Sequence, residues 1–248
     1  MQSPKSTAEI ISNSKFFFGG KEILIQHKKG VVGQNYYEDF GIKHFHKIAS
    51  NPLCKSVLNA GVGKGLYLIA AMTLQNIKQG TGIDINPLAI QLTKNNLISN
   101  NITKSVILNV GDVKKYFKKK FVVDLIAFDL PHIPLPSDSD LSEELKRIID
   151  GGPDGREYID FMIKNSPKHL KKKGRIFFVE PDFSGSRTFK LMKENGLIPK
   201  ILARKKKHLS ETITTKSKRE YLMSLGYRFK SDSKGEYFMM RAIYGVKK

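Results

Sequence analysis

Four short groups of glycine and acidic residues each stand directly after an apolar run of the sequence. The first is the segment NAGVGKG at 59–65, whose glycines would let a ligand approach the backbone closely. The second group is Asp84, the last residue of its apolar run. The third group contains Asp112, and the fourth begins at Asp129. Backbone amides and carboxylates gathered in this way are suited to binding a nucleoside.

The glycine segment does not match either common phosphate-binding motif. Leu66 stands where the dinucleotide motif GxGxxG needs its third glycine. The P-loop motif is excluded because Leu58 replaces its first glycine, and Gly65 replaces the Ser or Thr that follows its lysine. A glycine loop alone is also compatible with an ordinary tight turn.

Two aspartates have both a binding and a structural interpretation. Asp84, which precedes Ile85, could accept hydrogen bonds from both hydroxyls of a ribose, or it could cap a helix that starts near Pro87. Asp112 could accept a hydrogen bond from an adenine amino group, or it could cap a short helix of its own. The residue pattern leaves both alternatives open.

An alternation of strands and helices from about residue 56 would position these groups. The pattern predicts seven strands, at 56–59, 80–84, 106–110, 125–129, 175–180, 198–203 and 237–246. It predicts helices at 66–75, 87–99, 158–170 and 188–195. Such alternation indicates an α/β fold, a parallel sheet covered on both faces, with ligands at the carboxyl ends of the strands.

The chain is expected to form an N-terminal extension, residues 1–50, followed by one domain over residues 51–248. Two apolar runs joined by Gly19-Gly20 predict a β-hairpin over 15–26 in the extension. Residues 204–234 carry ten Lys or Arg against three Asp or Glu, and this length favours a basic insertion between the last two strands.

Charge and composition limit the classes of function. The net charge of +20 indicates a polyanionic partner such as RNA or DNA, although the lysine-rich composition is also typical of an AT-rich genome. A single cysteine, Cys54, excludes a disulfide framework. No apolar run approaches the length of about 18 residues that a membrane helix needs, and no signal peptide is apparent, so we expect a cytoplasmic protein without a membrane partner.

Together the four groups resemble the class I S-adenosylmethionine-dependent methyltransferases, over residues 55–200. The resemblance implies a Rossmann-like fold whose seven-stranded, mostly parallel sheet has an antiparallel last strand. It implies that the glycine loop holds the methionine part of S-adenosylmethionine, that the second strand end binds the ribose, and that the third contacts adenine. The expected cofactor-binding residues are then Asn59, Ala60, Gly61, Gly63, Gly65, Asp84, Ile85, Gly111, Asp112, Val113 and Asp129.

A narrower resemblance is to the amino-methyltransferase branch, which includes release-factor glutamine and rRNA guanine methyltransferases. Asp129 and Pro131 match positions of its Asn/Asp-Pro-Pro-aromatic motif, and GGPDG at 151–155 matches its Gly-Gly-x-Asp-Gly block. Leu130 replaces the first proline, and His132 replaces the aromatic residue. The sequence DLP is also similar to the Asn-Leu-Pro of tRNA guanosine methyltransferases.

In these families the fourth strand end faces the methyl acceptor, so the expected catalytic residues are Asp129, Leu130, Pro131 and His132. Asp129 and the Leu130 carbonyl would accept the N–H bonds of a nitrogen acceptor. His132 could stack on the acceptor or take the released proton.

The expected function is therefore an N-methyltransferase that acts on RNA or another translation-related macromolecule and binds nucleic acid. The alternatives are a small-molecule methyltransferase, a tRNA guanosine methyltransferase-like enzyme, and a binding module without catalysis. No metal site is expected, and no oligomeric state is predicted.

Overall fold

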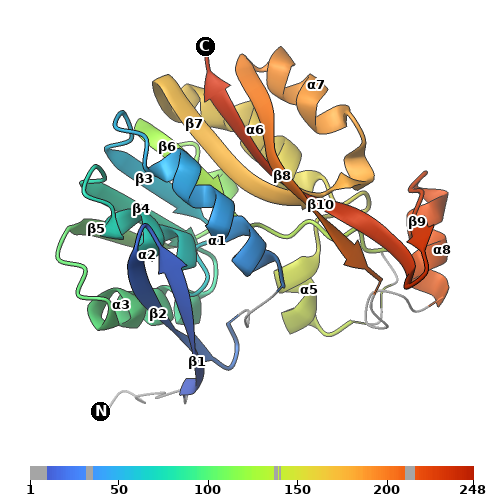
Figure 1. Cartoon of the computed structure of the whole chain (residues 1–248), viewed down its shortest axis with the longest axis horizontal. Coiled ribbons are helices and arrows are strands. Elements are labelled where there is room, and N and C mark those ends of the chain that lie inside the picture. Colours follow the sequence, from blue (N-terminus) through green and yellow to red (C-terminus); the bar gives the residue numbers. More distant parts are fainter. Residues whose placement is uncertain (1–9, 32–35, 137–138, 140, 210–215) are drawn as a thin grey trace.

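A computed structural model of the chain shows an α/β fold around one large mixed sheet (Figure 1). The structure describes residues 10–31, 36–136, 139, 141–209 and 216–248. The main path of the sheet runs in the order β5 (Ser105–Val110), β4 (Gln79–Asp84), β3 (Ser56–Ala60), β6 (Val123–Phe128), β7 (Leu170–Pro181), β10 (Gly235–Lys247) and β8 (Leu197–His208).

The first five strands of this path are parallel to one another, whereas β10 is antiparallel to both of its neighbours, β7 and β8. A short strand, β9 (Lys230–Asp232), pairs with β10 beyond the main path. Every residue of β3 and β6 is buried, as expected for central strands covered on both faces. The predicted mostly parallel sheet with an antiparallel last strand is confirmed.

Helices cover both faces of the sheet. On one face, α1 (Tyr36–Ala49) and α2 (Leu66–Thr73) pack into a core that includes Phe45 and Phe177. On the other face, α6 (Glu157–His169) and α7 (Arg187–Glu194) pack around Phe178 and Met192. Figure 1 shows α1 crossing in front of the sheet while α6 lies behind it.

One further long helix, α3 (Pro87–Ser99), packs on β4 and β5, and several short elements complete the fold. The short elements are α4 (Val113–Tyr116), α5 (Glu143–Ile149), the 3₁₀ turn η1 (Asp182–Ser184) and α8 (Lys216–Ser224). None of the helices in the described ranges is long and apolar enough to cross a membrane.

The N-terminal hairpin consists of β1 (Ile10–Phe18) and β2 (Lys21–Lys28), as the sequence predicts. Gly19 and Gly20 have φ values of 59° and 78°, and a type I′ turn, one of the two primed types, requires both values to be positive. Its apolar side chains join the core beneath α1 and α2, so the hairpin is packed onto the domain.

The structure contains elements that were not predicted, among them α5, α8 and β9, and two further differences bear on the site. Helix α1 was not predicted, because Gly41 and several polar residues obscure its apolar face. Gly41 is required there, since a Cβ at this position would lie 1.8 Å from the Tyr67 hydroxyl. Strand β8 continues through His208, because Arg204 to His208 pair with β10, so the first five residues of the basic stretch belong to the sheet.

Candidate active site

The glycine loop between β3 and α2 is shaped by three glycines with left-handed backbone angles. The φ values of Gly61, Gly63 and Gly65 are 67°, 54° and 90°. A Cβ at Gly61 would lie 2.8 Å from the carbonyl oxygen of Asp129, so this glycine lets the loop touch the segment after β6. A Cβ at Gly63 would meet nothing within 4 Å, so the backbone there is open to a ligand.

Asp84 lies at the end of β4, beside this open position. Its Oδ2 accepts a hydrogen bond of 2.8 Å from the Gly63 amide, and its Oδ1 accepts one of 2.9 Å from the Asn86 amide. Burial raises the pKa of Asp84, while these backbone donors lower it. The N-cap of α3 is Asn86, whose side chain accepts from Leu88, so the interpretation of Asp84 as the helix cap is wrong.

Asp112 follows β5 and caps α4. Its Oδ1 accepts a 2.9 Å hydrogen bond from the Lys115 amide, which confirms the capping interpretation for that oxygen. A Cβ at Gly111 would meet nothing within 4 Å, and the Gly111 amide donates to the Asp84 carbonyl at 2.8 Å. The second and third strand ends are therefore joined directly, and the backbone at Gly111 is open.

The other residues expected to bind the cofactor differ in exposure. Asn59, Ala60 and Val113 have buried side chains, so any contact from them would be made by the backbone. The Asn59 Nδ2 donates to the Ala127 carbonyl at 3.4 Å and so links β3 to β6. Ile85, in contrast, is 63% exposed, so its side chain is accessible to a ligand.

Asp129 follows the last residue of β6 and is solvent-exposed. Its amide donates to the Ala60 carbonyl at 3.3 Å, which holds it beside the start of the glycine loop. The surrounding protein still desolvates the carboxyl and raises its pKa, and the charge of Lys64, together with that of His132 when its ring is protonated, opposes this shift. The protonation of Asp129 therefore depends on the balance between desolvation and the nearby positive charge.

His132 lies two residues after Leu130 and contacts it directly. The Nδ1 of His132 lies 3.0 Å from the Leu130 carbonyl oxygen. Because a carbonyl can only accept, Nδ1 carries the hydrogen, and the lone pair of the neutral ring is on Nε2. The carbonyl has a second lone pair for another donor.

The GGPDG block packs against the backbone of His132. The Gly151 amide donates to the Ile133 carbonyl at 2.9 Å. A Cβ at Gly151 would lie 2.6 Å from the His132 Cα, and a Cβ at Gly155 would lie 2.7 Å from the His132 carbonyl oxygen. Glycine is therefore required at both positions for the block to close on the segment after β6.

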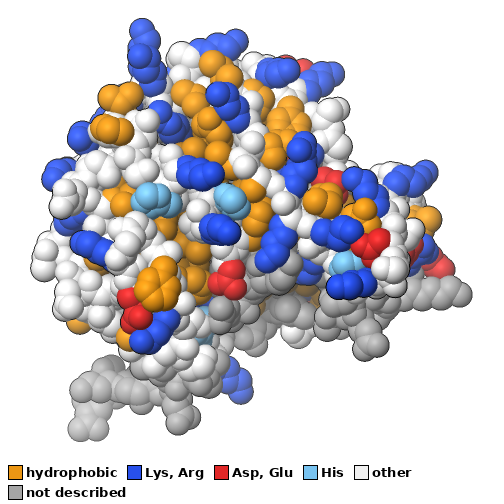
Figure 2. Space-filling model, viewed as in Figure 1, with side chains coloured by type: hydrophobic (Ala, Val, Ile, Leu, Met, Phe, Trp, Pro, Cys, Tyr) orange, Lys and Arg blue, Asp and Glu red, His pale blue; other side chains and the backbone are white. Residues whose placement is uncertain are grey.

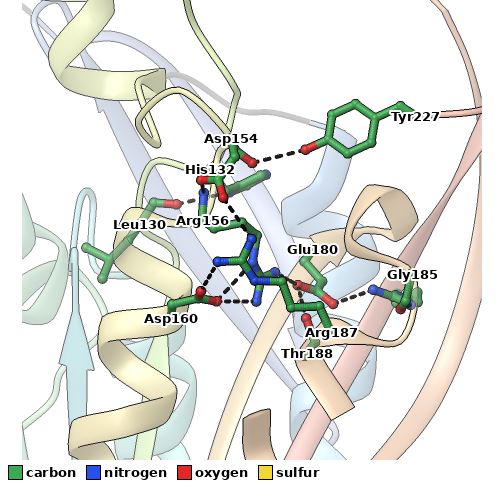
Figure 3. Close-up of polar contacts among 11 residues, drawn as sticks. Leu130, His132, Asp154, Arg156, Asp160, Glu180, Gly185, Arg187, Thr188 and Tyr227 are labelled. Atoms are coloured by element: carbon green, nitrogen blue, oxygen red, sulfur yellow. Dashed lines mark hydrogen bonds and ion pairs between the residues drawn. The ribbon is translucent and has the colours of Figure 1, made fainter. Parts of the chain in front are cut away.

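An ion-pair network lies behind this block and was not predicted from the sequence (Figure 3). The buried guanidinium of Arg156 donates to Glu180 at 2.7 Å and to Asp160 at 2.6 Å. Arg241 donates to the second oxygen of Glu180 at 2.6 Å, and Arg187 bridges Asp154 and Asp160. Three arginines thus balance three carboxylates and tie the GGPDG block to α6, β7, α7 and β10.

Two tyrosines of the basic stretch attach it to the same block. The hydroxyl of Tyr221 donates to the Pro153 carbonyl at 2.7 Å, and that of Tyr227 donates to the Asp154 carbonyl at 3.0 Å. Burial raises the pKa of Tyr227 to about 12, so this hydroxyl keeps its proton. The stretch between β8 and β10 therefore lies beside the segment that carries His132.

Comparison with known proteins shows to which family the chain belongs. Residues 41–129 match the family model described as Ribosomal protein L11 methyltransferase (PrmA). Over 153 residues the chain is 36% identical to the putative protein N5-glutamine methyltransferase of Methanocaldococcus jannaschii, covering 61% of this chain and 75% of that protein. The chain belongs to the same family of class I methyltransferases as this relative. S-adenosylmethionine is the cofactor of this methyltransferase.

The chain covers a smaller share of a further relative and of a solved structure with a similar fold. The methyltransferase is 31% identical over 126 residues to the release factor glutamine methyltransferase of Thermodesulfovibrio yellowstonii, covering 49% of this chain and 44% of that protein. It shares a fold with the solved tRNA m1G37 methyltransferase of M. jannaschii, with a TM-score of 0.57, 15% identity, and coverage of 95% of this chain and 57% of the other. The chain thus spans about half the length of these two proteins.

The residues at the strand ends fit this cofactor. Gly63 and Gly111 leave open backbone on either side of the Asp84 carboxylate, which has acceptor positions beyond its two amide donors. Carboxylate acceptors and open peptide groups are what a ribose and an adenine require.

The ion-pair network around Arg156 had no signal in the sequence, because its members come from four separate elements.

Proposed function

We propose that this methyltransferase transfers a methyl group to a nitrogen of a planar amide or amino group on a macromolecule of the translation machinery. The observation that supports this most strongly is the position of Asp129 and Leu130 directly after β6, where the Asp129 backbone carbonyl and the Leu130 side chain lie against Gly61 of the glycine loop. S-adenosylmethionine supplies the methyl group as an activated sulfonium. Catalysis then consists mainly of positioning and charge stabilisation by the protein.

We assign the cofactor side of the site to the ends of β3, β4 and β5. The open backbone at Gly63 would receive the methionine part, and the Asp84 carboxylate would accept the ribose hydroxyls. The exposed Ile85 side chain and the backbone from Gly111 to Val113 would border the adenine. Asp112 keeps one oxygen beyond its capping bond for the adenine amino group.

On the acceptor side, Asp129 would accept one N–H bond and the remaining lone pair of the Leu130 carbonyl would accept the other. Both contacts would turn the nitrogen lone pair toward the methyl group, and an ionised Asp129 would stabilise the positive charge that develops on nitrogen. Pro131 restricts the backbone between Leu130 and His132. His132 Nε2 would take the released proton, because Nδ1 is held by Leu130.

Two classes of acceptor have separate support. A glutamine side-chain amide in a protein is favoured by the names of both relatives, which describe protein or release factor glutamine methylation. A nitrogen of an RNA base is favoured by the net charge of +20 and by the DLP strand end. Figure 2 shows Lys and Arg side chains spread over the face that carries α1, with few Asp or Glu among them.

Part of the charge in the basic stretch is neutralised within the fold. Lys206 and His208 both bind Asp232, and Arg219 binds Glu236. These acidic partners are already counted in the net charge of +20, so the pairs fix where three basic side chains lie without lowering that charge. We place the glutamine amide first because the names of both relatives support it.

The experiment that tests the proposal uses purified enzyme, isotopically labelled S-adenosylmethionine and an extract from cells that lack the gene. Label in the protein fraction that survives nuclease supports the glutamine amide, and label that nuclease removes supports the RNA base. Label that appears only in small molecules would contradict a macromolecular acceptor. If the enzyme binds the cofactor but no fraction becomes labelled, the catalytic proposal is contradicted.

A further inference from the structure

Two asparagines, Asn96 of α3 and Asn100 at its C-cap, hold the free edge of the N-terminal hairpin. The Leu24 amide donates to Asn100 Oδ1 at 2.9 Å, and Asn100 Nδ2 donates back to the Leu24 carbonyl at 2.6 Å. One turn earlier, the Gln26 amide donates to Asn96 Oδ1 at 2.9 Å, and Asn96 Nδ2 donates back to the Gln26 carbonyl at 3.2 Å. The two side-chain amides thus pair with β2 as a neighbouring strand would.

Each asparagine has one bond besides those to the hairpin, and that of Asn100 goes from Nδ2 to the Asn96 carbonyl at 2.7 Å, whereas that of Asn96 reaches the glycine loop. The Nδ2 of Asn96 donates to the Lys64 carbonyl at 2.9 Å, in the middle of the glycine loop. The preceding carbonyl, that of Gly63, accepts from the Thr93 hydroxyl at 2.9 Å. Both Thr93 and Asn96 are fully buried, so water cannot replace either donor.

The hairpin determines which way the Asn96 amide faces. The Gln26 N–H must meet an oxygen, which fixes Oδ1 on the hairpin side and directs the Nδ2 hydrogens to the Gln26 and Lys64 carbonyls. If the hairpin left α3, the Asn96 amide would keep its bond to the Lys64 carbonyl but lose the two bonds to Gln26 that fix its orientation. The hairpin therefore helps to set the conformation of the loop.

We propose that Asn96 is a positioning residue that couples the seating of the N-terminal hairpin to cofactor binding. The proposal rests on the assignment of the glycine loop to S-adenosylmethionine made above. It gives the hairpin a role beyond packing, because one side-chain amide holds both the hairpin and the peptide that follows Gly63. Coupling of this kind is reciprocal, so the cofactor must also stabilise the contact between hairpin and α3.

The first test compares the affinity of S-adenosylhomocysteine, by calorimetry, for Asn96→Ala and the matched control Asn100→Ala. Both variants lose two bonds to the hairpin, but only Asn96→Ala loses the bond to the loop. We expect Asn96→Ala to raise Kd about tenfold and Asn100→Ala to change it by less than about twofold. Equal loss in both variants, or no loss in either, would overturn the proposal.

Thr93→Val separates the loop from the hairpin, since it removes only the donor to the Gly63 carbonyl. It should weaken S-adenosylhomocysteine binding while leaving the hairpin amides unchanged in hydrogen exchange. Asp84→Asn tests the assignment on which the proposal rests. If Asp84→Asn weakens binding and Asn96→Ala does not, the loop binds the cofactor and the coupling alone is wrong; if neither weakens binding, the assignment itself fails.

A measurement on the unaltered enzyme keeps the test decisive if Asn96→Ala does not fold. Saturating S-adenosylhomocysteine should slow hydrogen exchange of the Leu24 and Gln26 amides about fivefold or more. Asn96→Ala, where it folds, should abolish this effect of the ligand. Exchange at these two amides that is the same with and without ligand would overturn the proposal.

Discussion

The carbonyl oxygen of Asp129 occupies the space that a side chain on Gly61 would need, since a Cβ at Gly61 would lie 2.8 Å from it. This contact brings the loop that we assign to the cofactor against the segment that we assign to the acceptor. Methyl transfer requires the two substrates to be held in line at short distance. The Gly61–Asp129 contact is the feature of the fold that makes such an arrangement possible.

Gly61→Ala should damage both stability and activity. The left-handed backbone alone costs a residue with a side chain about 1–2 kcal/mol, and the clash with Asp129 adds to this. Gly20→Ala is the matched control, because Gly20 also has a positive φ but has nothing within 4 Å of its Cβ position. Thermal unfolding should show a loss in both variants, whereas only Gly61→Ala should lose methyl transfer. Equal activity in the two variants would contradict the role of the contact.

Asp129→Asn should separate cofactor binding from turnover. The amide keeps the size of the side chain but cannot stabilise positive charge on the acceptor nitrogen, so single-turnover rates should fall roughly 100- to 1,000-fold. The Kd of S-adenosylhomocysteine, measured by calorimetry, should stay within about threefold of that of the unaltered enzyme, since the bond from Asp129 to Ala60 comes from the backbone. Turnover that survives the substitution would show that Asp129 is not the acceptor-side carboxylate.

The raised pKa of Asp129 predicts a pH dependence of both activity and stability. Activity needs the ionised form, so it should fall as pH drops through the raised pKa, at a higher pH than for an ordinary aspartate. The folded protein binds this proton more tightly than the unfolded chain does. Ionised Asp129 therefore destabilises the fold above its folded pKa.

Asp129→Asn should accordingly raise the melting temperature at neutral pH. The gain should disappear as pH falls through the folded pKa toward the unfolded value of about 3.9, where the aspartate is protonated in both states. Thermal unfolding of the two proteins between neutral and acid pH checks this. A melting temperature that is lower in Asp129→Asn at neutral pH would show that the carboxylate is stabilised by the fold.

The network behind the GGPDG block predicts a contrast between two arginines. Arg156→Met would leave Glu180 and Asp160 buried with one cationic partner fewer, so it should cost about 3–5 kcal/mol of unfolding free energy. Arg187→Met removes a side chain that is half exposed and should cost about 1 kcal/mol or less. Urea unfolding measures both. Similar costs for the two substitutions would contradict a stabilising core centred on Arg156.

The sequence predicted the elements that have a local signature and missed those that depend on distant contacts. Helix α3 covers the predicted residues because Pro87 fixes its start, and the hairpin turn follows from Gly19 and Gly20. Helix α1 escaped prediction because Gly41 is there to pack against Tyr67, a contact between separate helices.

In the candidate site, too, features with a local signature were predicted and those that depend on distant contacts were not. The strand ends at Asp84, Asp112 and Asp129 were predictable because a polar residue follows an apolar run. The bond from Asp84 to Gly63 and the two attachments of Asn96 were not, because each joins residues at least 21 positions apart. Only the fold brings these groups together.

The atom that receives the methyl group tests the central claim most directly. The unaltered enzyme and Asp129→Asn would be incubated with labelled S-adenosylmethionine and extract from cells that lack the gene, and the labelled product would be sequenced by mass spectrometry. We predict one labelled residue in which the methyl group is on nitrogen, and loss of that product with Asp129→Asn. A methyl group on oxygen, sulfur or carbon, or equal labelling by the two enzymes, would contradict the account.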